Sequence, residues 1–266
     1  MPLAVDRTTL DALVDLARQA GDVVMSVYAQ DFDVMHKGDQ SPVTVADERA
    51  EAVIVAGLRA LDASIPIVAE ESMAKGQRPA ALGTRFWLVD PLDGTKEFIR
   101  RNGEFTVNIA LIENGAPVMG VVYAPALGRM YAGAAGLGAY RWLDNAQKTE
   151  AIAVRRADTS ALVAVASKSH RTPETDAYLN RLPVTDSRSA GSSLKFCLVA
   201  EGSADIYPRF GPTCEWDTAA GDAVLRAAGG AVLDFSGAPL RYGKPDFLNP
   251  HFLAHGQVDD VAPYLN

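Results

Sequence analysis

The sequence predicts an α/β protein in which an α+β N-terminal lobe is followed by an α/β C-terminal lobe. Apolar residues recur at helical spacing from Leu10 to Val27, as in an amphipathic helix. From Phe105 to Trp142, alternating or continuous apolar runs are broken by turn residues, which is typical of antiparallel strands. After Asp144, strand-like and helix-like segments alternate. We therefore expect one lobe over residues 1–144, a second over residues 145–266, and a ligand site in the cleft between them.

Two helices and a short strand are expected to open the N-terminal lobe. The first helix is predicted from about Thr9 to Tyr28, with Thr8 and Asp11 resembling a capping box. The second is predicted from about Val45 to Leu61 and is followed by a strand from Ile65 to Ala69. This lobe should therefore pack helices on a sheet.

The C-terminal lobe is expected to alternate strands with helices. Its predicted strands are Ala161–Ala166, Ala204–Tyr207 and Ala231–Phe235, and its predicted helices are Pro173–Leu182, Ser192–Glu201 and Thr218–Ala228. The sequence shows no flexible linker, so the two lobes are expected to share a rigid interface.

Composition limits the possible partners and compartments. The chain has 266 residues and a formal net charge of -8, which does not favour a broad nucleic-acid-binding surface, and no stable nucleic-acid partner is expected. Cys197 and Cys214 are the only cysteines, which favours a reducing compartment and hence the cytoplasm. The N-terminus lacks the pattern of a signal peptide, and no apolar stretch approaches the roughly 20 residues that cross a bilayer. Peripheral association with the inner membrane is the only membrane contact left open.

Residues 87–98, WLVDPLDGTKEF, join an apolar strand to a turn with two carboxylates, Asp90 and Asp93. Pro91 fixes its own φ and Gly94 permits backbone conformations closed to other residues, so a sharp turn can direct both acids to one point. We expect one ion to bridge them.

Further acids follow other apolar segments. Glu70 and Glu71 come after the strand that ends at Ala69, and Asp217 opens a helix after Trp216. Carboxylates brought together repel one another, and hard divalent cations with oxygen ligands relieve that repulsion. Mg²⁺ is the predicted ion because no His or Cys in the cluster favours zinc.

Each acid also has a structural explanation when it is taken alone. An Asp-Gly pair is a common turn, Asp217 is suited to capping its helix, and Glu70 with Glu71 fits a solvated loop. Thr95 and Asp47 are candidates to orient and deprotonate an attacking water. Asp47 equally fits a capping box with Thr44 at the start of the second helix.

Four motifs together resemble the inositol monophosphatase superfamily of lithium-sensitive, Mg²⁺-dependent phosphomonoesterases. They are SPVT at residues 41–44 leading to Asp47, AEES at 69–72, DPLDGT at 90–95 and WDTAAG at 216–221. They span nearly the whole chain in the order typical of that superfamily. The resemblance implies a layered αβαβα sandwich of the inositol monophosphatase/fructose-1,6-bisphosphatase type.

Three further segments resemble one branch of the superfamily. KEF at residues 96–98, GSSLKFC at 191–197 and YPRFGP at 207–212 are similar to the 3'(2'),5'-bisphosphate nucleotidases, and among them to the bacterial CysQ group. The implied substrate is adenosine 3',5'-bisphosphate, a by-product of sulfate activation and sulfotransfer. Hydrolysis of its 3'-phosphate leaves AMP.

The resemblance also implies a role for each matching residue. Two or three Mg²⁺ ions would be bound by the side chains of Glu70, Asp90, Asp93 and Asp217 and by the carbonyl of Leu92. Asp47 and Thr95 match the pair that activates water. The substrate is expected to contact Glu70, Asp93, Gly94, Thr95 and Asp217.

The second phosphate of such a substrate needs its own donors. Ser192, Lys195, Arg209 and the segment SKSHR at residues 167–171, with His170, supply hydroxyl and cationic groups in the second lobe. Any one of these basic residues alone is equally consistent with a solvated surface.

Other interpretations stay open at this stage. An inositol monophosphatase or broad-specificity sugar phosphatase would share all the metal residues. A regulatory RNA- or protein-binding member of the superfamily is a further alternative, although the complete acidic set argues against binding as the sole role. A homodimer is possible by analogy with relatives. Cys197 is expected to pack in the core, and the Gly-rich tract at 133–138 is expected to form turns.

Overall fold

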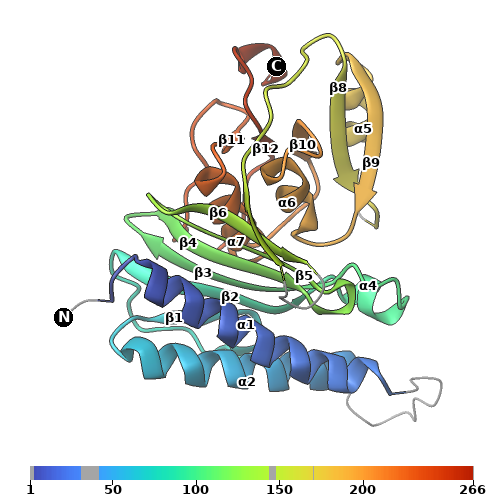
Figure 1. The fold of residues 1–266 in the computed structure, drawn as a ribbon. Helices are drawn as coiled ribbons and strands as arrows, with labels where there is room; N and C mark the ends of the chain where they lie inside the picture. Colours follow the sequence, from blue (N-terminus) through green and yellow to red (C-terminus); the bar gives the residue numbers. More distant parts are fainter. Residues whose placement is uncertain (1–2, 31–41, 144–147, 170, 266) are drawn as a thin grey trace.

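This computed structural model of the chain describes residues 3–30, 42–143, 148–169 and 171–265. Five layers are visible in Figure 1. Helices α1 (Arg7–Tyr28) and α2 (Pro42–Asp62) cover one face of a seven-stranded sheet, and α6 (Leu194–Ala200) and α7 (Glu215–Ala227) cover the other. A five-stranded sheet follows, with α5 (Pro173–Leu179) on its outer side. The expected αβαβα sandwich is confirmed.

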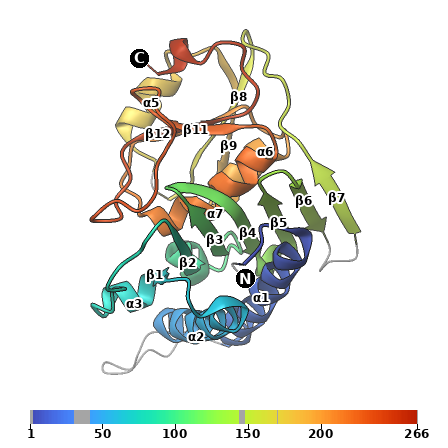
Figure 2. The ribbon, with the colours of Figure 1, turned by 90° about the vertical axis from the view of Figure 1, so that its left-hand side faces the viewer.

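The first sheet keeps the order of the chain. Its strands are β1 (Ile67–Ala69), β2 (Arg85–Asp93), β3 (Thr106–Glu113), β4 (Ala116–Ala124), β5 (Arg129–Ala134), β6 (Gly138–Leu143) and β7 (Lys148–Ile152). β1 pairs with β2 in parallel and the later pairs are antiparallel, which confirms the meander. Figure 2 shows β1 and β7 at opposite edges. Because β7 pairs with β6, this sheet continues to Ile152.

The second sheet has the spatial order β11-β12-β10-β8-β9. Its strands are β8 (Leu162–Ser167), β9 (Val184–Ala190), β10 (Ile206–Arg209), β11 (Ala231–Asp234) and β12 (Phe252–His255). β8 pairs in parallel with β9 and β10, whereas β12 is antiparallel to β10 and β11. Short helical turns complete the chain: α3 (Glu70–Ala74), α4 (Thr95–Ile99), η1 (Pro125–Leu127) and η2 (Ala262–Tyr264).

Three strands were not predicted from the sequence, and two predicted caps are wrong. β9 has the polar sequence VTDSRSA and is largely exposed at the sheet edge, so it lacks the apolar pattern of a buried strand. β7 and β12 were also missed. The N-cap of α1 is Asp6, whose side chain accepts from the Thr9 N–H at 2.8 Å, in place of the Thr8 capping box. α2 begins at Pro42, so Thr44 lies inside the helix and does not cap it.

Strand alternation directs the two faces of the first sheet to different cores. Val107, Ile109 and Leu111 pack against α1 and α2, whereas Ala110 and Ile112 face the layer that contains α7. On β2 the residues Phe86 and Leu88 also face that layer. Since side chains alternate along a strand, Asp90 shares their face and points toward α7.

Small residues bring α7 close to the sheet. A Cβ at Gly120 would lie 2.7 Å from the Ala220 carbonyl oxygen, and one at Gly133 would lie 2.7 Å from the Ala227 Cβ. Glycine is therefore needed at both positions by the approach of the helix. Cys197 is buried in α6, as expected. Among the described helices, none combines the length and apolarity that crossing a membrane requires.

Candidate metal and phosphate site

A cavity of about 490 Å³ lies where the end of β2 meets α4, α6 and α7. Most of the residues singled out in the sequence line it: Glu70, Asp90, Leu92, Asp93, Gly94, Thr95, Ser192, Lys195, Arg209 and Asp217. Asp47 is not among its lining residues. His170 lies outside the described residues, so its predicted role stays a prediction.

The end of β2 is irregular where the sequence predicts a turn, but Asp90 and Asp93 both still belong to the strand. The pairing of β2 with β3 shifts register between Asp90 and Asp93, and the Asp90 Oδ1 accepts from the Leu92 N–H at 3.0 Å. Gly94 then takes a φ of 96°, in the left-handed region that other residues rarely adopt. The chain thereby reverses at the cavity, and α4 begins at Thr95.

Three carboxylates from three elements converge in the cavity wall. Glu70 begins α3, Asp90 lies in the buried part of β2, and Asp217 lies in the first turn of α7. One oxygen from each lies within 4.8 Å of the others. Such an oxygen-only donor set fits a hard divalent cation.

The pKa values of the clustered carboxyl groups also indicate a cation site. Burial, with the neighbouring charge of Asp93, raises the pKa of Glu70 to about 7 and that of Asp217 to about 8. Burial and then the charge of Glu70 raise the pKa of Asp90 well above its usual range. Burial also raises the pKa of Asp93, although Lys195 and Ser193 oppose the shift. The cluster therefore takes up protons unless a cation neutralises it.

Asp217 both caps α7 and belongs to the cluster. Its Oδ2 accepts from the Cys214 N–H at 2.8 Å, which forms the capping contact that was the structural alternative for this residue. A carboxylate has two oxygens, so capping does not prevent it from binding a cation. The cap also fixes the carboxylate at the start of the helix.

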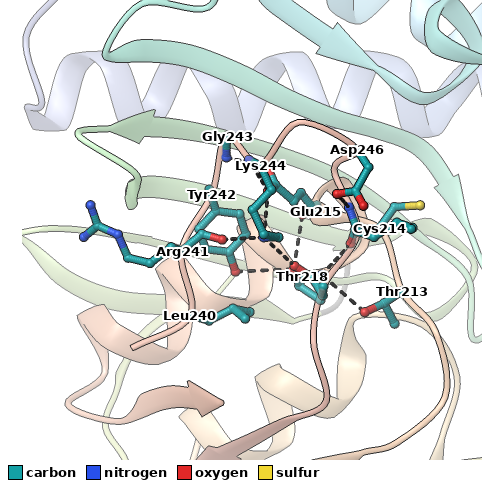
Figure 3. A network of polar contacts seen from close by, with 12 residues as sticks. Thr213, Cys214, Glu215, Thr218, Leu240, Arg241, Tyr242, Gly243, Lys244 and Asp246 are labelled. Atoms are coloured by element: carbon teal, nitrogen blue, oxygen red, sulfur yellow. Dashed lines mark hydrogen bonds and ion pairs between the residues drawn. The ribbon is translucent and has the colours of Figure 1, made fainter. Parts of the chain in front are cut away.

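A second polar network joins the start of α7 to residues 242–244 (Figure 3). Glu215 is fully buried and accepts from the Gly243 N–H at 2.7 Å and the Lys244 N–H at 2.9 Å. The Lys244 ammonium lies 2.7 Å from the same carboxylate. One turn further along, the Thr218 Oγ1 lies 3.3 Å from the Tyr242 hydroxyl. The residues 242–244 are thus bound to the turn that carries Asp217.

Glu51 was not predicted to belong to the site, but it holds the segment that begins with Glu70. Its buried carboxylate accepts from the Glu71 N–H at 2.8 Å and from the Ser72 hydroxyl at 2.6 Å. Glu70 and Glu71 therefore begin a helix anchored to α2 and do not form a solvated loop. The spacing of four residues between Asp47 and Glu51, which places both on one helix face, was an available signal.

Asp47 and Thr95 lie in different environments. Asp47 is buried, and its pKa is raised to about 8 by burial and by Glu71 and Glu70. Thr95 is exposed at the wall of the cavity. Both residues are within the described part of the chain, and no hydrogen bond joins them there. The predicted pairing of Asp47 with Thr95 therefore stays a prediction.

The basic groups proposed for a second phosphate are buried. Lys195 and Arg209 are only 4% and 9% exposed. The Lys195 ammonium donates to the Ser192 carbonyl at 2.5 Å, and burial lowers its pKa to about 8. The Arg209 Nε donates to the Gly211 carbonyl at 3.1 Å. Both side chains are thus held in the wall by backbone oxygens.

Only part of the segment 167–171 reaches the cavity. Ser167 lines it, together with Thr172, which the sequence did not single out. Ser169 instead donates to Glu97 at 2.5 Å, and Arg171 pairs with Asp176 at 2.5 Å. Within the described part of the segment, the cavity is therefore reached by Ser167 alone.

Comparisons with known proteins agree with the family that the sequence motifs resemble. The family model described as "Inositol monophosphatase family" matches residues 6–261. A protein of Escherichia coli O157:H7 named 3'(2'),5'-bisphosphate nucleotidase CysQ is 52% identical, with 91% of this chain and 98% of the relative covered. The protein of the same name from Buchnera aphidicola is 42% identical, with 93% and 94% covered.

Solved structures agree in fold. The crystal structure of CysQ from Bacteroides thetaiotaomicron has a TM-score of 0.81 and 42% identity, covering 94% of this chain and 97% of that chain. The inositol monophosphatase from Anabaena has a TM-score of 0.77 and 29% identity, covering 97% and 94%. The fold, the acidic cavity and these matches over nearly the whole length lead to one conclusion: the chain belongs to the inositol monophosphatase family.

Proposed function

We propose that this chain is a phosphomonoesterase that hydrolyses the 3'-phosphate of adenosine 3',5'-bisphosphate to give AMP and phosphate. The observation that carries the proposal is the pairing, in one cavity, of an acidic cluster able to hold cations with two buried cationic side chains, Lys195 and Arg209. The names of the relatives support this substrate, because the E. coli and Buchnera proteins are bisphosphate nucleotidases by name.

Mg²⁺ is the proposed cofactor, as two or three ions. Glu70, Asp90, Asp93 and Asp217 would hold them through their side chains, with Leu92 contributing its carbonyl. Their oxygen-only character and raised pKa values support this assignment. Bound divalent ions would neutralise phosphate charge and lower the pKa of water.

The residues at the start of α4 are proposed to act on the reacting phosphate and water. The left-handed Gly94 places Thr95 in the wall of the cavity, where its hydroxyl is able to orient water. Asp47 is the proposed proton acceptor. Since no hydrogen bond joins the two described side chains, proton transfer from Thr95 to Asp47 would require them to approach each other.

Lys195 and Arg209 are proposed to recognise the second phosphate. Their burial strengthens their attraction for an anion, because water screens it less there. Ser192 and His170 complete the proposed donor set. An inositol monophosphate carries only one phosphate, so these cations would serve it less well.

A direct comparison of substrates tests the proposal. The purified protein is given adenosine 3',5'-bisphosphate or inositol 1-phosphate, with Mg²⁺ or with EDTA, and phosphate release is measured. We expect Mg²⁺-dependent release with a clear preference for the bisphosphate. A preference for inositol 1-phosphate would favour the inositol monophosphatase alternative, with which several solved structures share the fold.

The lobe division at residue 144, a homodimer and a cytoplasmic location are retained as parts of the same proposal. Sedimentation of the purified protein tests the dimer, and fractionation of cells tests the location.

A further inference from the structure

Ser193 contacts both of the segments that carry Asp93 and Asp217. It precedes α6 and is only 1% exposed. Its Oγ lies 3.2 Å from the Asp93 Oδ2 and 2.7 Å from the backbone carbonyl oxygen of Asp217. One hydroxyl group therefore touches the end of β2 and the first turn of α7.

Asn108 on β3 fixes that hydroxyl. Its side chain is also 1% exposed, and its Nδ2 donates to the Ser193 Oγ at 3.1 Å and lies 3.5 Å from the Asp93 Oδ2. Because Asn108 occupies the acceptor side of Ser193, the hydroxyl proton is directed toward Asp217 or Asp93. The three side chains and the α7 carbonyl thus form one hydrogen-bonded network.

This network matters most while no cation is bound. Asp93 and Asp217 are half-buried, and their carboxylates repel each other when both are ionised. The two residues are far apart in the chain, so local backbone geometry does not fix the distance between them. A neutral group that forms hydrogen bonds to both segments would hold them together without adding charge to the site.

We propose that Ser193 is a positioning residue that fixes Asp93 and the Asp217 turn relative to each other, so that the acids are arranged for a divalent cation in advance. This inference deepens the proposed function, because it concerns the arrangement of the proposed metal ligands. Ser193 does not need to touch substrate. Replacing Ser193 should therefore weaken metal binding. Any loss of activity that follows should be the same for every substrate.

Calorimetric titration of the purified protein with MgCl₂ tests the inference without any substrate. Ser193→Ala should raise the Mg²⁺ dissociation constant by about 10-fold or more, the range typical when a partner of a metal ligand is lost. Ser193→Thr, which keeps the hydroxyl, should recover most of the affinity. The matched control is Ser203→Ala, since that hydroxyl also donates to a carboxylate, Glu201, at 2.7 Å but lies outside the cavity lining.

The outcomes separate the inference from the proposed function. Weaker Mg²⁺ binding by Ser193→Ala supports the inference even if the parent protein does not hydrolyse adenosine 3',5'-bisphosphate. A Ser193→Ala protein that binds Mg²⁺ within about twofold of the parent overturns it, even if the parent is an active nucleotidase. If Ser193→Ala does not fold, Asn108→Ala is titrated instead, and unchanged affinity there overturns the inference as well. A parent protein that binds no Mg²⁺ rejects both proposals.

Discussion

The carboxylate of Glu51 accepts a hydrogen bond from the backbone N–H of Glu71 at 2.8 Å, and so joins α2 to the first turn of α3. The same carboxylate accepts from the Ser72 hydroxyl at 2.6 Å. Glu51→Ala should lower the free energy of unfolding by about 1–3 kcal/mol, because two partly buried donors lose their acceptor. Urea denaturation measures this, with the exposed Asp11→Ala as a control expected to change stability little.

Asp93→Asn tests the acidic cluster directly. The substitution keeps the shape of the side chain and removes its charge, so the protein should fold while phosphate release from adenosine 3',5'-bisphosphate falls by at least about 100-fold. Circular dichroism checks the fold, and phosphate release in saturating Mg²⁺ checks the activity. Activity equal to that of the parent would contradict the assignment of Asp93 as a metal ligand.

Stability without metal should fall as the pH rises. The pKa values of Glu70, Asp217 and Asp47 are raised to about 7, 8 and 8 in the folded chain, from ordinary values of 4.5, 3.8 and 3.8. Between those limits the folded state holds protons that the unfolded state has released, so the unfolding free energy decreases with pH. In EDTA, the melting temperature should be lower at about pH 8 than at about pH 6.

Mg²⁺ should reverse this trend, because the cation replaces protons that are released on binding. The rise in melting temperature on adding Mg²⁺ should therefore be larger at about pH 8 than at about pH 6. An equal rise in melting temperature at both pH values would show that the carboxyl groups with raised pKa values do not bind the ion.

Lys195→Ala distinguishes phosphate recognition from loop support. If the ammonium binds the second phosphate, KM should rise about 10-fold or more for adenosine 3',5'-bisphosphate, since hydrogen bonds to charged groups contribute about 1.5–3 kcal/mol. KM for inositol 1-phosphate should change much less. Equal losses for both substrates would instead assign Lys195 to holding the Ser192 carbonyl, to which it donates at 2.5 Å.

The acid-bearing turn could be predicted from the sequence because its information is local. Pro91 and Gly94 constrain the chain within a few residues of Asp90 and Asp93, and the structure has a register shift between the two acids and a left-handed Gly94 directly after them. Helices α1 and α2 were found for a similar reason, since their apolar residues repeat at helical spacing.

What the sequence did not reveal depends on long-range contacts. Ser193 meets Asp93 across 100 positions, and Glu51 meets Glu71 across 20, so neither contact leaves a local pattern. β9 was missed because a polar edge strand has little to bury. The proposed pairing of Asp47 with Thr95 also depends on long-range packing, because the two residues lie on α2 and α4.

Gly120→Ala should disturb the cavity from a distance. An added Cβ would lie 2.7 Å from both the Ala220 carbonyl oxygen and the Ala223 Cβ, so α7 would have to move away from β4. Overpacking of this kind costs about 1–3 kcal/mol. Because Asp217 lies one turn before Ala220, its carboxylate should shift with the helix and weaken Mg²⁺ binding. Gly256→Ala is the matched control, since its Cβ would meet atoms no closer than 3.4 Å. Urea denaturation and titration with MgCl₂ measure both effects, and a Gly120→Ala protein as stable as the control would contradict the close approach of α7 to the sheet.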